Sequence, residues 1–243
     1  MPKRNHRDDL RSGPEGESAA PARPEPWRRR LFLPAYRVSD AARYAGISPQ
    51  TVAYWHYSSS EVGPALPGKE RRVPLSYLQL IEVAFVATFR RLGVPLQRIR
   101  KAREYAQQTL QSEFPFAELR WRTEGYHLLL RLQEIEPANE LNALIIADSA
   151  GQTAWAPLVG DRFAEFDYDD GGIAITWHCA GRQNPIKIDP RISFGAPIIR
   201  GIPTWVIKGR TIAGETIEEI QHEFDLDSED VLVALKFEGI QAA

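Results

Sequence analysis

The pattern of apolar and polar positions between residues 39 and 55 predicts two short helices joined by a tight turn. Ser39 suits the N-cap of the first helix, and Gly46 can adopt the positive φ of the turn. Ser48 is a second capping residue, and Pro49 suits the first position of the second helix. The residues that two crossing helices would bury are all apolar or small: Ala41, Ala42, Ala45, Ile47, Val52 and Trp55. This spacing is typical of a helix-turn-helix unit.

Two longer helices are predicted next. Apolar side chains recur every three or four positions from Leu75 to Leu92, and again up to Leu110. Gly93 and Pro95 mark the boundary between the two helices. We expect their apolar faces to form core or a dimer surface. The second helix also has a basic face that we expect to lie in solvent: Arg98, Arg100, Lys101 and Arg103.

The hydrophobic pattern becomes strand-like after residue 140. Apolar and β-branched runs lie at 141–148, 154–160, 163–168 and 172–179. The turn residues Asp169–Gly172 predict a hairpin within a small antiparallel sheet. Trp155 and Trp177 are interpreted as core residues, with the lining of an effector pocket as the alternative.

The C-terminal residues predict three further helices. Pro203 opens the first helix and Gly214 ends it. Thr216 and Glu219 have the spacing of a capping box for the second helix. Ser228 suits the N-cap of the third.

Charge divides the chain into two unlike halves, although the whole chain carries a formal charge of only -2. Residues 1–122 hold 21 Lys and Arg against 12 Asp and Glu, a net charge of +9. Residues 123–243 hold 9 against 20, a net charge of -11. This asymmetry suggests a basic half that faces a polyanion and an acidic half that faces another partner. The first 30 residues contain five prolines and few large apolar side chains, so we expect a disordered basic tail.

Composition argues against several classes of protein. A single cysteine, Cys179, leaves no disulfide framework or multi-cysteine metal site and favours the cytoplasm. No run of 18 apolar residues is present and the first residues lack an apolar stretch, so we expect neither a transmembrane helix nor a secretory signal. Without a phosphate loop, a nucleophile elbow or a paired-histidine motif, we expect no enzyme, no catalytic residue and no cofactor. Asp167, Asp169, Asp170 and His178 could be read as a metal site, but Asp-Asp-Gly is typical of a turn, so we expect no metal.

DNA contacts are predicted on the second helix and on the turn-rich segment that follows it. The second helix of a helix-turn-helix enters the major groove, and Gln50 at its start can pair with adenine. Cations at the end of residues 57–74 predict a short β-wing that grips phosphates, with a plain solvated loop as the alternative. The expected DNA-contacting residues are Arg37, Arg43, Ser48, Gln50, Thr51, Tyr54, Lys69, Arg71 and Arg72.

These residues resemble a known family. The stretch RVSDAARYAGISPQTVAYW, the basic segment after it and the run LSYLQLIEVAFVATFRRLGVPLQRIRKA are similar to the MerR-like winged helix-turn-helix domain over residues 36–110. The resemblance implies DNA binding by the helix from Ser48 to Trp55 and by the wing. MerR regulators usually continue into a long dimerising coiled coil, whereas here Pro115 and Pro137 precede a β-rich region.

A second resemblance covers residues 187–239. Asp-Pro, then Phe-Gly-x-Pro, then glycine fall on Asp189, Pro190, Phe194, Gly195, Pro197 and Gly201. This pattern resembles a small domain of unknown function that is common in VapB-type antitoxins of bacterial toxin–antitoxin pairs. One departure is the run IRGIPTW, where many members have Gly-Thr-Arg. The resemblance implies a PIN-like ribonuclease toxin as partner.

The three-helix unit is acidic, so phosphate would repel it, and we expect it to bind a basic protein or to self-associate. The expected partner-binding residues are Phe194, Pro197, Trp205, Glu219, Glu223, Asp227 and Asp230.

The predicted fold class is α+β, with an N-terminal MerR-like winged helix-turn-helix, a small central antiparallel β region and a C-terminal three-helix unit of helix-turn-helix shape. The predicted segments are a disordered basic tail (1–30), the DNA-binding domain (31–122), a β-rich connecting region (123–188) and the acidic antitoxin-type domain (189–243). The predicted function is a homodimeric antitoxin that neutralises its toxin and binds operator double-stranded DNA. The alternative is a ligand-sensing MerR-like regulator with an effector site in the β region.

Overall fold

The structure is a computed structural model, and it describes residues 25–57, 64–118 and 164–240. Its helices are η1 (Pro26–Leu31), α1 (Val38–Tyr44), α2 (Pro49–Tyr57), α3 (Tyr77–Arg91), α4 (Leu96–Leu110), η2 (Pro115–Ala117), η3 (Ser193–Gly195), α8 (Thr204–Ile212), α9 (Ile217–Phe224) and α10 (Ser228–Phe237). Its strands are β1 (Phe166–Tyr168), β2 (Ala174–Trp177), β3 (Lys187–Ile188), β4 (Pro197–Ile199) and β5 (Ile202–Pro203). This mixture of helices and antiparallel strands confirms the predicted α+β class.

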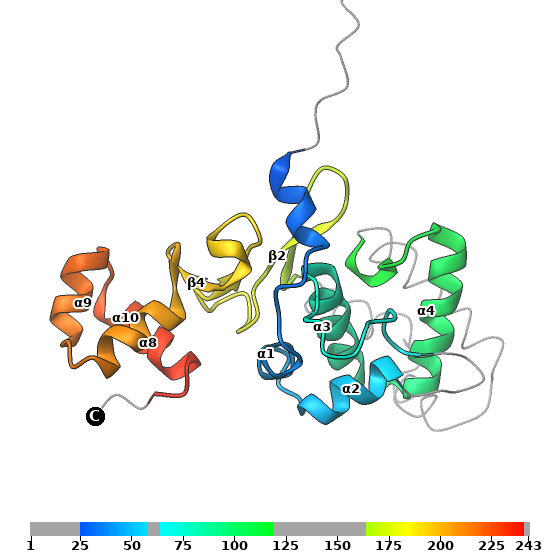
Figure 1. The fold of residues 1–243 in the computed structure, drawn as a ribbon, viewed down its shortest axis with the longest axis horizontal. Helices are drawn as coiled ribbons and strands as arrows, with labels where there is room; N and C mark the ends of the chain where they lie inside the picture. The colour runs from blue at the N-terminus through cyan, green and yellow to red at the C-terminus, as the bar shows by residue number, and fades with distance from the viewer. Residues whose placement is uncertain (1–24, 58–63, 119–163, 241–243) are drawn as a thin grey trace, which may run out of the picture.

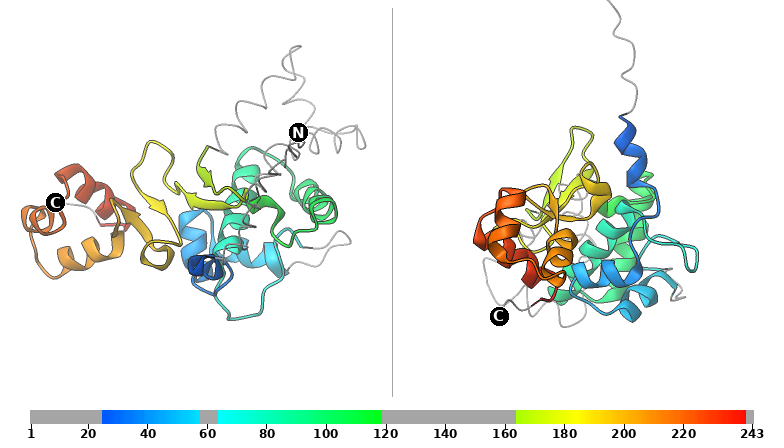
Figure 2. Two further views of the ribbon diagram at one scale, coloured as in Figure 1. Left: turned by 90° about the horizontal axis from the view of Figure 1, so that it is seen from above. Right: turned by 60° about the vertical axis from the view of Figure 1, so that its left-hand side comes forward.

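The elements are arranged along one long direction. Helices α1–α4 gather at one end and helices α8–α10 at the other, with the strands between them (Figures 1 and 2). The predicted strands at 141–148 and 154–160 lie outside the described residues, as does Trp155. Residues 26–30, which we expected in a disordered tail, belong to η1, whose Leu31 is buried.

Helices α1 and α2 form at the predicted place. Helix α1 begins at Val38, one residue before Ser39, because its N-cap is Arg37. The backbone N–H of Arg37 donates to the Asp40 carboxylate at 3.2 Å. Gly46 has a φ of +66°, as the turn requires. Ser48 Oγ then accepts a hydrogen bond from the Thr51 N–H at 3.1 Å, which caps α2.

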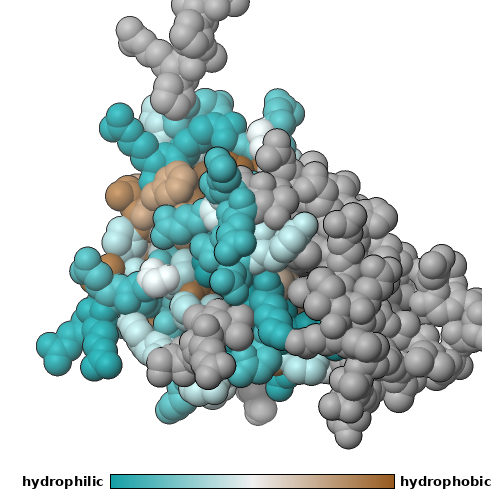
Figure 3. Space-filling model, turned by 90° about the vertical axis from the view of Figure 1, so that its right-hand side faces the viewer, coloured by the Kyte–Doolittle hydropathy of each residue, from teal (hydrophilic) through white to brown (hydrophobic). Residues whose placement is uncertain are grey.

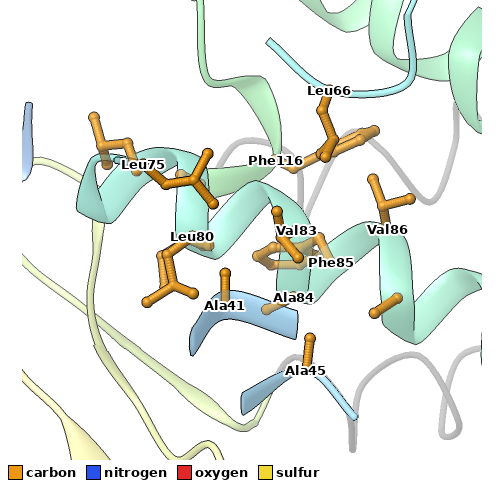
Figure 4. Packing of buried hydrophobic residues seen from close by; sticks show 14 of the residues in the cluster. Ala41, Ala45, Leu66, Leu75, Leu80, Val83, Ala84, Phe85, Val86 and Phe116 are labelled. Carbon is orange, nitrogen blue, oxygen red and sulfur yellow. The ribbon is translucent and has the colours of Figure 1, made fainter. Parts of the chain in front are cut away.

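Small residues let α1 pack closely on α3. Ala41 of α1 and Ala45, the C-cap of that helix, face Ala84 of α3 in the core (Figure 4), and all three side chains are buried. Val52 and Trp55 of α2 are buried in the same core, whereas Ile47 in the turn is half-buried against it. The burial pattern predicted for the helix pair is therefore confirmed at these positions.

The basic face of α4 differs from the prediction. Arg100 and Arg103 are buried, not solvated. Arg103 Nε lies 3.5 Å from the buried Glu82 carboxylate of α3, and its Nη2 donates to the Glu113 carbonyl at 2.9 Å. Glu82 in turn accepts from the N–H groups of Phe116 and Ala117, at 2.7 and 3.2 Å. For Arg103 the prediction was wrong because residues 113–117 fold back over α3 and α4 and cover it together with Glu82.

The sheet runs in sequence order, β1-β2-β3-β4-β5, and every neighbouring pair is antiparallel. The predicted hairpin is confirmed, since Asp169 N–H donates to the Ile173 carbonyl at 3.0 Å between β1 and β2. Phe166 of β1 stacks on Phe85 of α3 with ring centroids 4.6 Å apart, so the start of the sheet shares the core of the N-terminal helices.

A second core forms around α8, α9 and α10. Its buried residues are Ile186, Ile199, Ile207, Ile220, Leu226, Val231, Ala234 and Leu235. The predicted capping box is present, with Glu219 N–H donating to Thr216 Oγ1 at 3.2 Å. Asp227, not Ser228, is the N-cap of α10. The predicted boundary at residue 189 falls between β3 and β4, which pair with each other.

The side of the molecule that carries α4 presents mostly hydrophilic described residues, with a small apolar patch (Figure 3). Within residues 25–57, 64–118 and 164–240, no helix is both long and apolar enough to cross a membrane.

Candidate nucleic-acid interface

The N-terminal end of α2 is open to solvent. Ser48 and Gln50 are exposed and Thr51 is half-buried, while Val52 and Trp55 anchor the opposite face of the helix in the core. Tyr54 is exposed one turn farther along. Helix α2 therefore turns a polar, uncharged edge outward at the place where a recognition helix would meet base edges.

The basic segment after α2 is held against that helix by its backbone. His56 Nδ1 lies 2.8 Å from the Pro67 carbonyl, and the Ala65 N–H donates to the Trp55 carbonyl at 3.1 Å. Lys69 Nζ donates to the carbonyls of Glu70 and Val73. No strand occurs within residues 64–74, so over this described part the predicted β-wing is wrong and the segment is an irregular loop. Residues 58–63, which the wing prediction also included, lie outside the described residues.

Helix α2 and the loop enclose an open groove of about 600 Å³. The structure brings five predicted DNA-contacting residues together there, and none of the described residues that line the groove is acidic. Its lining residues are Arg37, Val38, Pro49, Gln50, Ala53, Tyr57, Lys69, Arg71, Arg72, Val73 and Pro74. Arg37, Arg71 and Arg72 are exposed, so their charges can reach a bound anion.

Tyr57 is a groove residue that the sequence interpretation missed. The guanidinium of Arg71 lies 5.7 Å from the centre of its ring, and its hydroxyl donates to the Glu70 carbonyl at 3.4 Å. Tyr57 is seven residues after Gln50, two helical turns along the same face. That spacing is the signal that could have identified it.

Arg43 lies apart from the groove and contacts the C-terminal unit. Its Nη1 donates to the Phe237 carbonyl at 3.1 Å and lies 3.4 Å from the Glu238 carboxylate. Ser48, Thr51 and Tyr54 do not line the groove either. The predicted contacts are thus distributed over a groove and its surroundings.

His56 is buried beneath this surface. Its burial lowers its pKa from 6.5 to about 4, although the hydrogen bond with the Pro67 carbonyl acts in the opposite direction. The imidazole is therefore neutral at physiological pH. Because a carbonyl only accepts hydrogen bonds, the proton lies on Nδ1.

The predicted partner-binding residues of the C-terminal unit fall into two groups. Phe194, Trp205, Glu219, Glu223 and Asp227 are exposed, whereas Pro197 and Asp230 are buried. Asp230 pairs with Arg200 and is closed to a partner that docks on the surface. Phe194 has a φ of +55° and follows Ser193 at +46°, so an exposed aromatic ring sits on a strained turn.

The acidic side chains that suggested a metal site have other partners. The Asp167 carboxylate is 3.0 Å from His178 Nε2 and also pairs with Arg182. Burial alone would raise its pKa, but those two hydrogen bonds hold the pKa below its usual range. Asp169 pairs with Arg28 at 2.5 Å. Across the residues that the structure describes, no cluster of His, Cys, Asp and Glu could hold a metal ion. Trp177 is buried in the core, as the favoured interpretation predicted.

The chain is similar to a protein that is named as a putative antitoxin, and its C-terminal part matches a family model. Residues 186–237 match the model of a family described as "Protein of unknown function (DUF433)", which agrees with the second resemblance. The chain is 24% identical over 229 residues to a Mycobacterium tuberculosis protein named "Putative antitoxin VapB45", covering 85% of this chain and 94% of that protein.

A solved structure is also similar in fold. The X-ray crystal structure of Rv2018 from Mycobacterium tuberculosis matches with a TM-score of 0.71 at 21% identity. The match covers 85% of this chain and 99% of that one. The similarity of fold therefore extends well beyond residues 186–237.

Proposed function

We propose that this protein is an antitoxin that also represses transcription, with its basic N-terminal half bound to operator DNA and its acidic C-terminal unit bound to a toxin. The observation that carries the DNA part is the groove between α2 and residues 69–74, where four cations and Gln50 converge and no acidic side chain is found among the described lining residues. The antitoxin part is supported by the similarity to a protein named as an antitoxin and by the DUF433 match.

In this proposal the residues of the interface have different roles. Arg37, Lys69, Arg71 and Arg72 would neutralise phosphates and fix the position of the protein on the duplex. Gln50, with a side-chain amide that can pair with adenine, would read sequence in the major groove. Ser48, Thr51 and Tyr54 extend this surface along α2. In the proposal α2 is the recognition helix of a MerR-like DNA-binding domain, with the basic loop beside it.

The toxin would be a basic ribonuclease of the PIN type. The exposed carboxylates of α9 and the following turn, Glu219, Glu223 and Asp227, would offer it complementary charge, and Phe194 offers an exposed aromatic anchor. Glu223 and Asp227 pair with Arg210 and Arg200 within the chain, and they would exchange these partners for cations of the toxin. Pro197 and Asp230 would act by holding the backbone of this unit. A homodimer would place two copies of α2 on half-sites about 34 Å apart.

Binding of the full chain to duplex from its own upstream region tests the DNA part. Arg71→Ala with Arg72→Ala should weaken binding to every sequence alike, whereas Gln50→Ala should change which sequence is preferred. Lys236→Ala, an exposed charge on α10, is the matched control and should leave binding unchanged. Wild-type affinity in the double arginine variant would contradict the assignment.

Pull-down of the toxin encoded beside it tests the other part. Glu219→Lys with Glu223→Lys should abolish capture and inhibition, while Glu104→Lys on α4 should not. Equal capture by both variants would contradict the acidic-surface assignment.

A further inference from the structure

One face of α8 is apolar and open to solvent. Trp205 is 60% exposed and Ile212 is 68% exposed, and both are large apolar side chains. Gly209 is exposed between them. Because the spacings are four and three residues, these positions form one stripe along the helix.

Gly209 is the unexplained member of the stripe. It lies inside a nine-residue helix, where glycine is the least favourable residue after proline. Its backbone does not adopt a positive φ, and a Cβ added there would meet nothing within 4 Å. Among the described residues, packing therefore gives no reason for a glycine. Glycine permits the close approach of another backbone, and position 209 leaves open space for one.

The rest of α8 is already occupied within the chain. Thr204 and Ile207 are buried on its opposite face. Arg210 Nε lies 2.8 Å from the Glu215 carboxylate, and Lys208 Nζ lies 3.9 Å from that of Glu238. The stripe itself is uncharged, and the cations beside it, Lys208 and Arg210, already have carboxylate partners within the chain.

We propose that this stripe is the surface through which two copies of the chain associate, with a two-fold axis passing beside Gly209. Two antiparallel α8 helices would bring their glycines together and set each Trp205 beside the partner's Ile212. A surface that fits itself in this way is what a two-fold dimer requires. The antiparallel arrangement also opposes the two helix dipoles favourably.

The absence of charge on the α8 stripe favours a second copy of the chain over the proposed toxin as its partner. A basic protein would be drawn to the carboxylates of α9, whereas the α8 stripe carries none. The inference supplies the dimer surface that the proposed repressor needs, but it requires neither DNA nor toxin. Its test can therefore fail while both of those activities remain.

Sedimentation of the purified full chain over a range of concentrations measures the association. Wild type should be dimeric at micromolar concentration. Gly209→Leu and Trp205→Ala should each raise the dissociation constant of the dimer at least tenfold. Neither substitution should lower the melting temperature of the monomer. Phe32→Ala removes an aromatic ring that is 59% exposed near η1, and it should leave the dimer intact.

Oxidative cross-linking tests the axis itself. Gly209→Cys should form a disulfide-linked dimer, since the two copies of position 209 meet there. Ala213→Cys, at the exposed C-cap of the same helix, should not, because it would face Trp205 of the other copy. Wild type controls for Cys179. A wild-type monomer at all concentrations, a dimer that survives Gly209→Leu, or equal cross-linking at 209 and 213 would overturn the proposal. A Trp205→Ala variant that stays dimeric but no longer captures toxin would also overturn it, because the stripe would then be a toxin surface.

Discussion

The guanidinium of Arg43 on α1 donates a hydrogen bond to the main-chain oxygen of Phe237, 3.1 Å away at the end of α10. These residues are 194 positions apart in sequence. The ring of Tyr44 stacks on that of Phe237, with centroids 6.0 Å apart and planes 18° apart. This contact joins the first helix of the candidate DNA-binding unit to the last helix of the acidic unit.

Phe237→Ala should remove that joint. A half-buried phenylalanine contributes less than a fully buried one, so we expect a loss of about 2 kcal/mol in the free energy of unfolding. Chemical denaturation measures it. Tyr105→Ala, an exposed aromatic on α4, is the control and should change stability by less than about 0.5 kcal/mol. Equal effects of the two substitutions would show that the joint contributes nothing.

Gly195 and Tyr36 form a second joint between the two halves. The Tyr36 hydroxyl donates to the Gly195 carbonyl at 2.9 Å, and Gly195 has a φ of +80°. A Cβ at this position would collide with that hydroxyl. We expect Gly195→Ala to cost at least about 2 kcal/mol from the strained backbone and the collision together.

Tyr36→Phe separates those two causes. Alone it should cost about 1 kcal/mol for the lost hydrogen bond. Combined with Gly195→Ala it should cost less than the sum of the single changes, because the hydroxyl that collides is gone. Strict additivity in a double-mutant cycle would contradict this account.

Burial of His56 should make stability fall as the solution is acidified. Its pKa is lowered from 6.5 to about 4, so the unfolded chain binds a proton that the folded chain does not. The stability is present above pH 6.5 and is lost as the pH falls toward 4, by roughly 3 kcal/mol at about 1.4 kcal/mol per pH unit. His56→Asn keeps a donor for the Pro67 carbonyl and should remove this dependence. Measured relative to the variant, wild type should lose stability between pH 6.5 and 4, and parallel curves would refute the assignment.

Burial of Glu82 should act in the opposite direction. Burial raises its pKa from 4.5 to about 7, even though Arg103 and two backbone N–H groups favour the charged form. The folded chain then holds a proton that the unfolded chain has released, so stability is present below pH 4.5 and is lost as the pH rises through 7. Glu82→Gln mimics the protonated side chain. Its unfolding free energy relative to wild type should increase by roughly 3 kcal/mol from pH 4.5 to 7.5. A constant difference would contradict the raised pKa.

The sequence predicted those parts of the fold that depend on local chemistry. Gly46, Ser48 and the Thr216–Glu219 capping box each determine a turn or a helix end within a few residues, and the structure has them as expected. Helix α1 starts earlier than Ser39 indicates, because Tyr36 bridges to Leu75 and directs the chain into the helix at Val38.

Features that depend on distant residues could not be predicted from the sequence. The burial of Arg103 depends on Glu82 and on a loop that returns at Phe116, none of which helical periodicity reveals. The same limit applies to the candidate site. Local reasoning identified Gln50 and Arg71 separately, but only the fold brings them to one groove. It also placed Asp230 on a partner surface, whereas in the structure its carboxylate is buried and pairs with the exposed Arg200.

The salt dependence of DNA binding tests the central claim most directly. The claim is that the groove between α2 and residues 69–74 binds duplex through its cations. If the complex makes about 6–10 phosphate contacts, affinity for the upstream duplex should fall roughly 10³–10⁵-fold between 50 and 200 mM salt. Removing Arg71 and Arg72 should reduce the slope of log affinity against log salt by about two. A flat salt response in wild type, or an unchanged slope in the double variant, would contradict the account.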